Sequence, residues 1–551
     1  MTTAKNVLLH AMALGLCCAA SLVAWAAPTP GAAAGKPEAA AAPAAGAAAA
    51  GPASAADHFT VEEQPSEGSV TIGGRRIDYQ AHAGTLIVHG RGWDDVPQNA
   101  DKDAKVPPAE ASMFYTAYFA KNPGSGPRPI TFLYNGGPGS STIWLHMGAF
   151  GPKRVLTPGD THPGAAPYAV VNNEYSLLDA SDLVFVDAPA TGYSRISGKD
   201  REKEFFNIDG DAHAFADFIQ QFLSKYGRWN SPKFLFGESY GTTRNAKLIA
   251  VLETEKLIDF NGVINLSQIE LFDANADTAE LNPGVELPYL VALPSYAATA
   301  WYHHRTSNAP AELPALLAEV EQFAMHDYAL ALLAGSTLDA ATRHAIAAKL
   351  HDYTGLSVDY IERAELRIDI GEYTQNLRAD GDATVGRLDA RFTGPAIDRL
   401  SKRADYDPQF AAIASAYVSA FNDYAHGALG YSPGRAFRTI PEDIHASWTA
   451  TSEHVSLLAV KAPNLLSDLA LAMKHNPRLK LMLNAGYFDL ATPYYEGVYE
   501  LNQLQIPAPL RANIETRFYE SGHMVYAKDS SLKQLHDNVA DFIRRTSNSG
   551  P

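Results

Sequence analysis

The chain has 551 residues, of which 46% are hydrophobic and 19% are charged, so it can bury the core of one large globular domain with an insertion. Its formal net charge of −17 argues against nucleic acids and anionic membranes as partners, because binding phosphate groups requires clustered lysine and arginine and no basic run is present.

The first 26 residues have the pattern of an export signal. Lys5 supplies a positive charge at the start, residues 7–23 are mostly apolar, and residues 24–26 offer an Ala-x-Ala cleavage site. A signal anchor is the alternative, but the apolar run is short and His10 interrupts it. We expect cleavage near Ala27, export to the periplasm or the extracellular space, and no stable membrane insertion afterwards.

Both cysteines of the chain, Cys17 and Cys18, lie inside the expected signal. The mature chain would then contain no disulfide, no catalytic cysteine and no cysteine-bound metal. Lipidation of Cys17 is an alternative that Leu16 disfavours, because that position normally carries a small residue. Residues 27–56 are almost entirely alanine, glycine and proline, which offers no patterned apolar face and predicts a linker.

From residue 67 the sequence alternates between strand and helix signals. Two continuous apolar runs, residues 129–134 and 183–186, are typical of strands buried on both faces. Residues 211–226 have helical spacing, and Asp209 or Asp211 could cap the start of this helix. The alternation predicts a central, mostly parallel sheet. The other expected elements are strands at residues 69–72, 76–79, 84–88, 113–119 and 233–236 and a helix at residues 242–255.

Between residues 273 and 445 the strand alternation stops. Alanine-rich helical stretches at residues 312–333, 339–353 and 410–424 indicate an inserted helical cap. A core at residues 57–272 and 446–548 would then enclose this insertion. The core resumes with strands at residues 479–483 and 515–519 and a helix at residues 530–544.

The motif Gly-Glu-Ser-Tyr-Gly at residues 237–241 lies between an expected strand and an expected helix. A tight strand-to-helix turn with small flanking residues projects a serine hydroxyl clear of a sheet, which makes Ser239 a candidate nucleophile. An ordinary glycine-rich turn with an incidental serine is the alternative. No metal or cofactor is expected, because helix capping explains the acids of the Asp209, Asp211 and His213 group and no further ligand is nearby in sequence.

Two loops after later strands carry the partners that a nucleophilic serine needs. Asp489 follows the strand at residues 479–483, and His523 follows the strand at residues 515–519. The chain order of nucleophile, acid and histidine is that of α/β-hydrolases, so Asp489 would orient His523 and His523 would move the proton. We therefore predict an α/β-hydrolase fold with a central mostly parallel sheet and an inserted helical cap.

A glycine-rich loop, Asn-Gly-Gly-Pro-Gly-Ser-Ser at residues 135–141, directly follows another expected strand. The N–H groups of Gly137 and Tyr240 could form an oxyanion hole. A phosphate-binding loop is the alternative, but no Gly-Lys-Ser/Thr follows and Pro138 removes one donor.

Four motifs in this order resemble the serine carboxypeptidases: residues 135–141, Val-Asp-Ala-Pro-Ala-Thr-Gly-Tyr-Ser at residues 186–194, the serine motif, and Gly-His at residues 522–523. The run at residues 386–389 suggests a bacterial branch. The resemblance implies that Asn135, Gly136 and Glu238 bind the substrate's C-terminal carboxylate. Glu238 can donate a hydrogen bond to a carboxylate only when protonated, which favours mildly acidic pH.

The leading hypothesis is an exported serine carboxypeptidase acting on peptides with a free C-terminus through an acyl-enzyme on Ser239. Ala149 stands where the family usually carries a glutamate that helps to hold the carboxylate. An esterase or acyltransferase that uses the same three residues is therefore an alternative. A non-catalytic exported binding protein is a third.

Overall fold

The computed structural model describes residues 59–91, 93, 107–121, 127–307, 310–449 and 462–547. The expected signal at residues 1–26 and the linker at residues 27–56 lie outside this part. Among the described helices, none is both long enough and apolar enough to cross a membrane.

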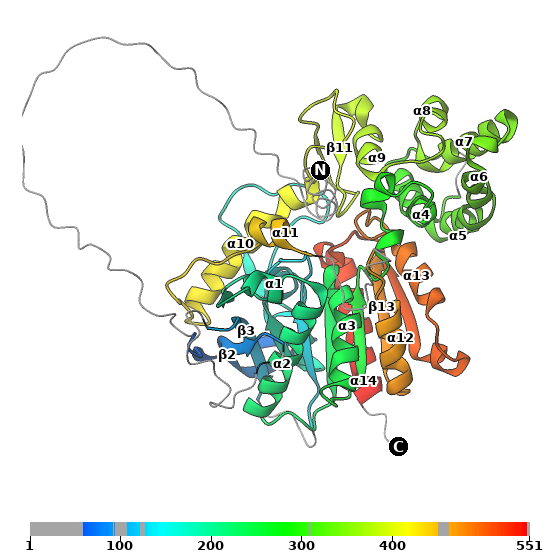
Figure 1. The fold of residues 1–551 in the computed structure, drawn as a ribbon. Coiled ribbons are helices and arrows are strands. Elements are labelled where there is room, and N and C mark those ends of the chain that lie inside the picture. Colours follow the sequence, from blue (N-terminus) through cyan, green and yellow to red (C-terminus); the bar gives the residue numbers. More distant parts are fainter. Residues whose placement is uncertain are drawn as a thin grey trace, which may run out of the picture.

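A ten-stranded mixed sheet forms the centre of the molecule (Figure 1). Its strands lie in the order β1-β2-β3-β7-β4-β9-β10-β13-β14, with β8 paired to β3. All neighbours from β7 to β14 are parallel, whereas the pairs from β1 to β7 are antiparallel. The bounds are β1 Glu63–Ile72, β2 Arg75–His89, β3 Glu110–Ala120, β4 Ile130–Tyr134, β7 Asp182–Val186, β8 Arg195–Ser197, β9 Lys233–Glu238, β10 Gly262–Leu266, β13 Lys480–Gly486 and β14 Ile514–Tyr519.

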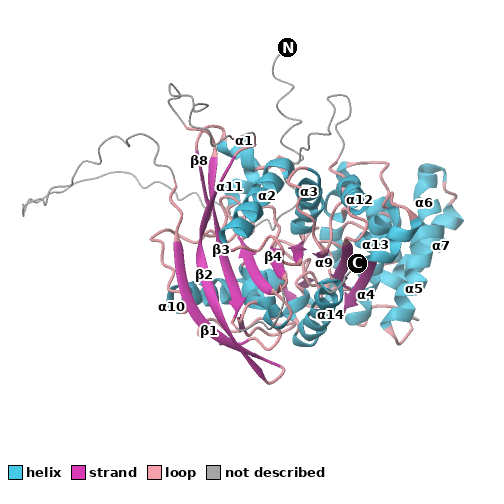
Figure 2. Ribbon diagram, turned by 90° about the horizontal axis from the view of Figure 1, so that it is seen from below, coloured by secondary structure: helices cyan, strands magenta, loops and turns pink. Residues whose placement is uncertain are grey.

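Helices cover both faces of this sheet, which buries β4, β7 and β10 along their whole length. Figure 2 shows α2, α3 and α12 on one side and α10 and α14 on the other. This arrangement confirms the predicted α/β-hydrolase fold class. The bounds are α1 Arg201–Phe205, α2 Ile208–Lys225, α3 Tyr240–Thr254, α10 Pro408–Gly427, α12 Leu466–His475, α13 Tyr494–Gln503 and α14 Asp529–Ser547.

The helices after β10 have two kinds of packing partner. Helices α4 to α9 form an apolar cluster of their own, to which Phe488 and Tyr494 contribute. In contrast, α10 packs on the sheet, and so does Ile444 of α11. The predicted boundaries at residues 273 and 445 stay a prediction. The bounds are α4 Leu287–Tyr302, α5 Leu313–Phe323, α6 Ala329–Ala334, α7 Ala340–Thr354, α8 Val358–Arg363, α9 Ile370–Asn376 and α11 Glu442–Ser447.

Several elements differ from the expectations. The strands expected at residues 76–79 and 84–88 are one strand, β2, because its pairing with β3 runs through the turn-like residues between them. Asn207, not Asp209 or Asp211, caps α2 by accepting from the Gly210 N–H. Strand pairs that no periodicity predicted are β5 Lys153–Val155 with β6 Val170–Asn172, and β11 Ala383–Val385 with β12 Thr393–Pro395.

Candidate active site

Ser239 lies in the sharp turn between β9 and α3. Its backbone has φ 60° and ψ −129°, a strained conformation for a residue with a side chain. The Ser239 N–H donates to the Leu266 carbonyl oxygen at 2.9 Å, which ties the turn to β10. A Cβ atom added to Gly237 would lie 2.1 Å from the Gly241 carbonyl oxygen, so this turn requires glycine at residue 237. The motif therefore folds as a strand, turn and helix.

Asp489 and His523 meet at the ends of two neighbouring strands, β13 and β14. His523 Nδ1 lies 2.8 Å from Asp489 Oδ2, and the carboxylate also accepts from the N–H groups of Ala491 and Thr492. Burial alone would lower the pKa of His523, but the charge and hydrogen bond of Asp489 outweigh it and raise the pKa above its usual value. Asp489 thus holds the imidazole in place and stabilises its charged form.

One cavity brings most of the predicted site residues together. Its lining includes Ser239 and His523 as well as Asn135, Gly136, Gly137 and Glu238. Asp489 lies behind the imidazole of His523 and does not line the cavity, and Tyr240 reaches the site through its backbone. Among the residues that the structure describes, no group of three or more His, Cys, Asp or Glu side chains is arranged to hold a metal ion.

The glycine-rich loop passes directly over the start of α3. A Cβ atom on Gly136 would lie 2.4 Å from the Tyr240 backbone nitrogen, and Gly137 has φ +111°, a conformation that favours glycine. Arg244, which is almost completely buried, donates to the Asn135 carbonyl oxygen at 3.0 Å. Its guanidinium also forms an ion pair with Asp211 at 2.7 Å. A buried ion pair therefore holds this loop against α3.

Glu238 is a buried acid at the edge of the cavity. Burial raises its pKa to about 7, although hydrogen bonds from Tyr526 and Asn135 and the charge of His523 oppose the rise. The Tyr526 hydroxyl donates to Glu238 Oε2 at 2.8 Å. At mildly acidic pH this side chain is therefore neutral and can donate a hydrogen bond.

Ala149 is completely buried in the π-helical turn Leu145–Phe150. Its carbonyl oxygen accepts from Asn173 Nδ2 at 2.8 Å, and its methyl group offers no polar contact. The neighbouring Gly148 lies against two tyrosine rings, because a Cβ atom there would come within 2.6 Å of Tyr417 and 2.8 Å of Tyr526. Two tyrosine rings thus pack against the turn that contains Ala149.

Four contacts of the site were not predicted from the sequence, and one of them is the hydrogen bond between Tyr526 and Glu238. The Thr492 hydroxyl donates to Asp489 Oδ2 at 2.8 Å, three residues along the same loop. The carbonyl oxygen of Leu388 accepts from the His523 N–H at 2.6 Å, and Asp389 accepts from the N–H of the preceding Gly522. Tyr526 lies three residues after His523, and this short distance in sequence is the signal that could have identified Tyr526 as part of the site. The segment at residues 386–389 thus supports the histidine loop.

Residues 104–306 match the family model described as serine carboxypeptidase. A "Carboxypeptidase Y homolog" of Arthroderma benhamiae is 31% identical over 138 residues, which are 25% of this chain and 25% of that protein. "Pheromone-processing carboxypeptidase KEX1" of Saccharomyces cerevisiae is 28% identical over 170 residues, which are 29% of this chain and 20% of that protein. The chain thus aligns with only about a quarter of the length of these relatives.

Solved structures were compared as well. A lipase in an open form has a TM-score of 0.31 at 15% identity, over 80% of this chain and 96% of that one. A peroxisomal α/β-hydrolase of Saccharomyces cerevisiae has a TM-score of 0.32 at 9% identity, over 88% of this chain and 90% of that one. Scores this low carry no argument, and the fold class rests on the sheet and its helices. The matched region contains the glycine-rich loop, Glu238 and Ser239, and over residues 104–306 the chain is similar to serine carboxypeptidases.

Proposed function

We propose that the protein is an exported serine carboxypeptidase that removes C-terminal residues from peptides. The observation that carries this proposal is a buried, protonatable Glu238 directly beside Ser239 in one cavity. A generic serine hydrolase has no need of an acid there, whereas a carboxypeptidase must recognise a carboxylate next to the bond that it cleaves. The match of residues 104–306 to the serine carboxypeptidase model supports the same function.

In the proposed reaction, Ser239 is the nucleophile. Asp489 binds His523 Nδ1, which leaves Nε2 to accept the serine proton as Oγ attacks the terminal peptide carbonyl. The N–H groups of Gly137 and Tyr240 stabilise the oxyanion. His523 then protonates the leaving amine, and water hydrolyses the acyl-enzyme by the reverse proton path.

The leaving residue is proposed to bind through its carboxylate to Asn135, Gly136 and Glu238. A neutral Glu238 donates to this carboxylate, whereas an ionised Glu238 repels it. Substrate binding should therefore weaken as Glu238 ionises near pH 7.

The cap at residues 273–445 is proposed to select side chains of the substrate, above a core formed by residues 57–272 and 446–548. Five residues of this segment line the cavity: Asn275, Arg387, Leu388, Phe410 and Ile440. Apolar and charged groups from the insertion thus lie beside the proposed nucleophile.

Export to the periplasm or the extracellular space is part of the same proposal. Its support is the sequence of residues 1–26, with a positive start, an apolar run and an Ala-x-Ala site. N-terminal sequencing of the protein purified from its native host should find a chain that begins near Ala27. A chain that retains the apolar run would contradict cleavage.

The central test is the dependence on Ser239 and on the terminal carboxylate. Mass spectrometry should show single residues leaving the C-terminus of free-acid peptides, and Ser239→Ala should abolish this release and labelling by a fluorophosphonate probe. Ser140→Ala is the matched control, because Ser140 lines the same cavity and its loss should leave labelling intact. Equal cleavage of amidated and free-acid peptides would contradict carboxylate recognition.

An esterase or acyltransferase is the second candidate, which Ala149 favours because the site lacks one acidic side chain of the family pattern. An acyl ester incubated with an amine acceptor separates the two functions. Transfer to the amine that exceeds hydrolysis would contradict the carboxypeptidase proposal.

A further inference from the structure

The donor groups around Glu238 are directed toward its carboxyl group. The Leu145 N–H donates to Asn135 Oδ1 at 3.1 Å, which orients the amide so that Nδ2 is its donor on the other side. The Asn135 side chain lies close enough to both Tyr526 and Glu238 to lower the pKa of each. Tyr526 in turn donates to Glu238 Oε2 at 2.8 Å. The Tyr526 hydroxyl and the Asn135 amide therefore both face the carboxyl group of Glu238 as donors.

This direction determines which oxygen atom of a neutral Glu238 carries the proton. An oxygen that accepts from a tyrosine hydroxyl is best left unprotonated, because the carbonyl-type oxygen of a carboxylic acid is the stronger acceptor. Oε2 is that oxygen, so a neutral Glu238 that keeps this hydrogen bond carries its proton on Oε1. Glu238 lines the cavity, whereas Tyr526 does not.

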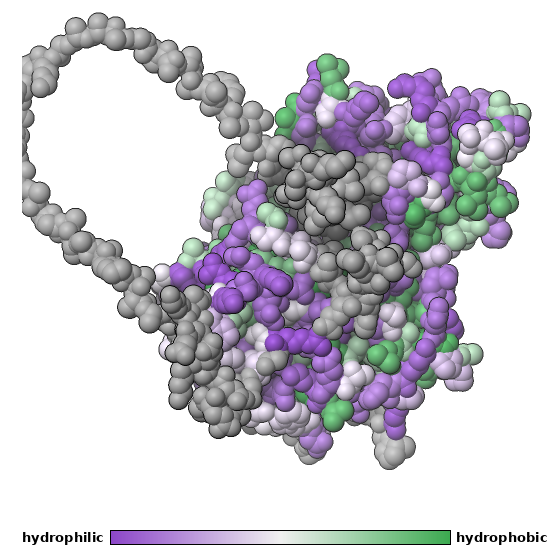
Figure 3. Space-filling view, viewed as in Figure 1, coloured by the Kyte–Doolittle hydropathy of each residue, from purple (hydrophilic) through white to green (hydrophobic). Residues whose placement is uncertain are grey.

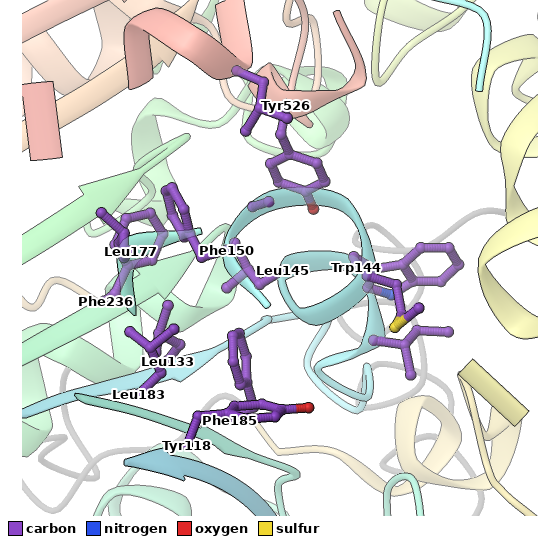
Figure 4. Close-up of a cluster of buried hydrophobic side chains, with 14 of the residues drawn as sticks. Tyr118, Leu133, Trp144, Leu145, Phe150, Leu177, Leu183, Phe185, Phe236 and Tyr526 are labelled. Carbon is purple, nitrogen blue, oxygen red and sulfur yellow. The ribbon is translucent and has the colours of Figure 1, made fainter. Parts of the chain in front are cut away.

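Tyr526 is held rigidly enough to impose this choice. The side chain is almost completely buried, and its ring packs against Gly148, where a Cβ atom would approach it to 2.8 Å. Figure 4 shows the hydroxyl group of Tyr526 directed toward the helical turn that contains Leu145. Tyr526 also lies in the loop that carries His523, so one loop positions both the proposed base and the partner of Glu238.

We propose that Tyr526 is a positioning residue: its hydroxyl group holds Glu238 Oε2 as a hydrogen-bond acceptor, so that the proton on Oε1 is presented to the terminal carboxylate of the substrate. This inference rests on the proposed carboxypeptidase function. Tyr526 does not touch the substrate. It acts through Glu238, and it supplies polar support next to the turn where Ala149 has none.

Tyr526→Phe tests the inference, because it removes one hydroxyl group and keeps the ring. The Tyr526 hydrogen bond lowers the pKa of Glu238, so its loss should raise that pKa further above 7. We expect the basic limb of kcat/KM for a free-acid peptide to move up by roughly one pH unit. KM should rise about tenfold and kcat should change less, since the proton of Glu238 is then shared between both oxygens.

Tyr417→Phe is the matched control. Tyr417 packs on the same glycine and is also buried, but its hydroxyl bonds to Thr157 rather than to Glu238. In this variant the basic limb of kcat/KM should lie at the same pH as in the wild-type protein. A limb that moves equally in both variants would overturn the specific role of Tyr526.

An infrared titration reads Glu238 directly, without substrate. The protonated carboxyl band, identified as the band that Glu238→Gln removes, should shift in frequency and persist to higher pH in Tyr526→Phe. An unchanged band together with an unchanged pH limb would overturn the inference. If the wild-type protein cleaves amides and free acids equally, the proposed function is wrong, and the infrared titration still decides whether Tyr526 controls the proton of Glu238.

Discussion

At the scale of single residues, the site combines two groups that influence each other's charge. The negative charge of Glu238 contributes to the raised pKa of His523, and His523 in turn lowers the pKa of Glu238. The proposed reaction needs both groups neutral, because His523 must accept a proton and Glu238 must donate a hydrogen bond. The active protonation state is therefore favoured at a pH above the pKa of His523 and below the pKa of Glu238.

Glu238→Gln should change both limbs of the pH profile. Glutamine cannot ionise, so the fall of kcat/KM above about pH 7 should disappear for free-acid peptides. The acid limb should move to lower pH, because removing the negative charge lowers the pKa of His523. The profile is measured with saturating and limiting peptide from acidic to alkaline pH.

Glu67→Gln is the control for this variant, since Glu67 is exposed and pairs with Lys121 far from the cavity. It should reproduce the wild-type profile. A basic limb that persists in Glu238→Gln would assign that limb to another group and contradict the role proposed for Glu238.

At the scale of elements, the buried parallel strands were predictable because they are uninterrupted apolar runs bounded by polar residues. Strand β10 was not predicted, although it is equally buried, since Asn265 breaks its short run. Within the site, sequence motifs predicted six of the residues that line the cavity: Asn135, Gly136, Gly137, Glu238, Ser239 and His523. Tyr526 and Leu388 were not predicted, because their roles arise from contacts between loops that only the fold brings together.

The glycine-rich loop gives a prediction at this scale. In Gly136→Ala, the added Cβ atom would meet backbone atoms of Glu238, Tyr240 and Gly241 at 2.4–2.7 Å, and none of these can rotate away. The loop must therefore shift away from the Tyr240 N–H. If this N–H forms the oxyanion hole, kcat should fall on the order of 10²- to 10³-fold.

Gly164→Ala is the matched control, because a Cβ atom there meets nothing within 4 Å. Thermal unfolding of both variants separates lost chemistry from lost folding. A Gly136→Ala protein with normal kcat would show that the close approach of this loop to α3 is not needed for the reaction.

At the scale of the whole molecule, the fold buries several glutamates whose pKa values are raised. Glu496 and Glu500 of α13 and the adjacent Glu270 are completely buried. Both carboxyl oxygens of Glu496 lack hydrogen-bond partners among the described residues. Burial raises the pKa of all three, and the charge of Glu500 raises the other two further. In α3, burial likewise raises the pKa of Glu253 to about 8.

These shifts imply that the contribution of the four buried glutamates to stability decreases toward alkaline pH. Each raised pKa means that the folded state binds a proton more tightly than the unfolded chain, whose glutamates titrate near 4.5. The unfolded state therefore binds fewer protons once the pH exceeds that value. The contribution of Glu253 to the free energy of unfolding should accordingly fall as the pH rises from about 4.5 to about 8, the pKa of Glu253.

Glu496→Gln should flatten this decline, because glutamine keeps the shape of the side chain and cannot ionise. Each unit of pKa shift that is removed is worth about 1.4 kcal/mol at alkaline pH, so the variant should exceed the wild-type protein in stability there and match it more closely in acid. Thermal unfolding across this pH range measures the difference. Glu442→Gln, which alters an exposed glutamate, should follow the wild-type curve. Parallel curves for Glu496→Gln and the wild-type protein would mean that Glu496 does not contribute to the loss, and the decline would then have to come from the other buried acids.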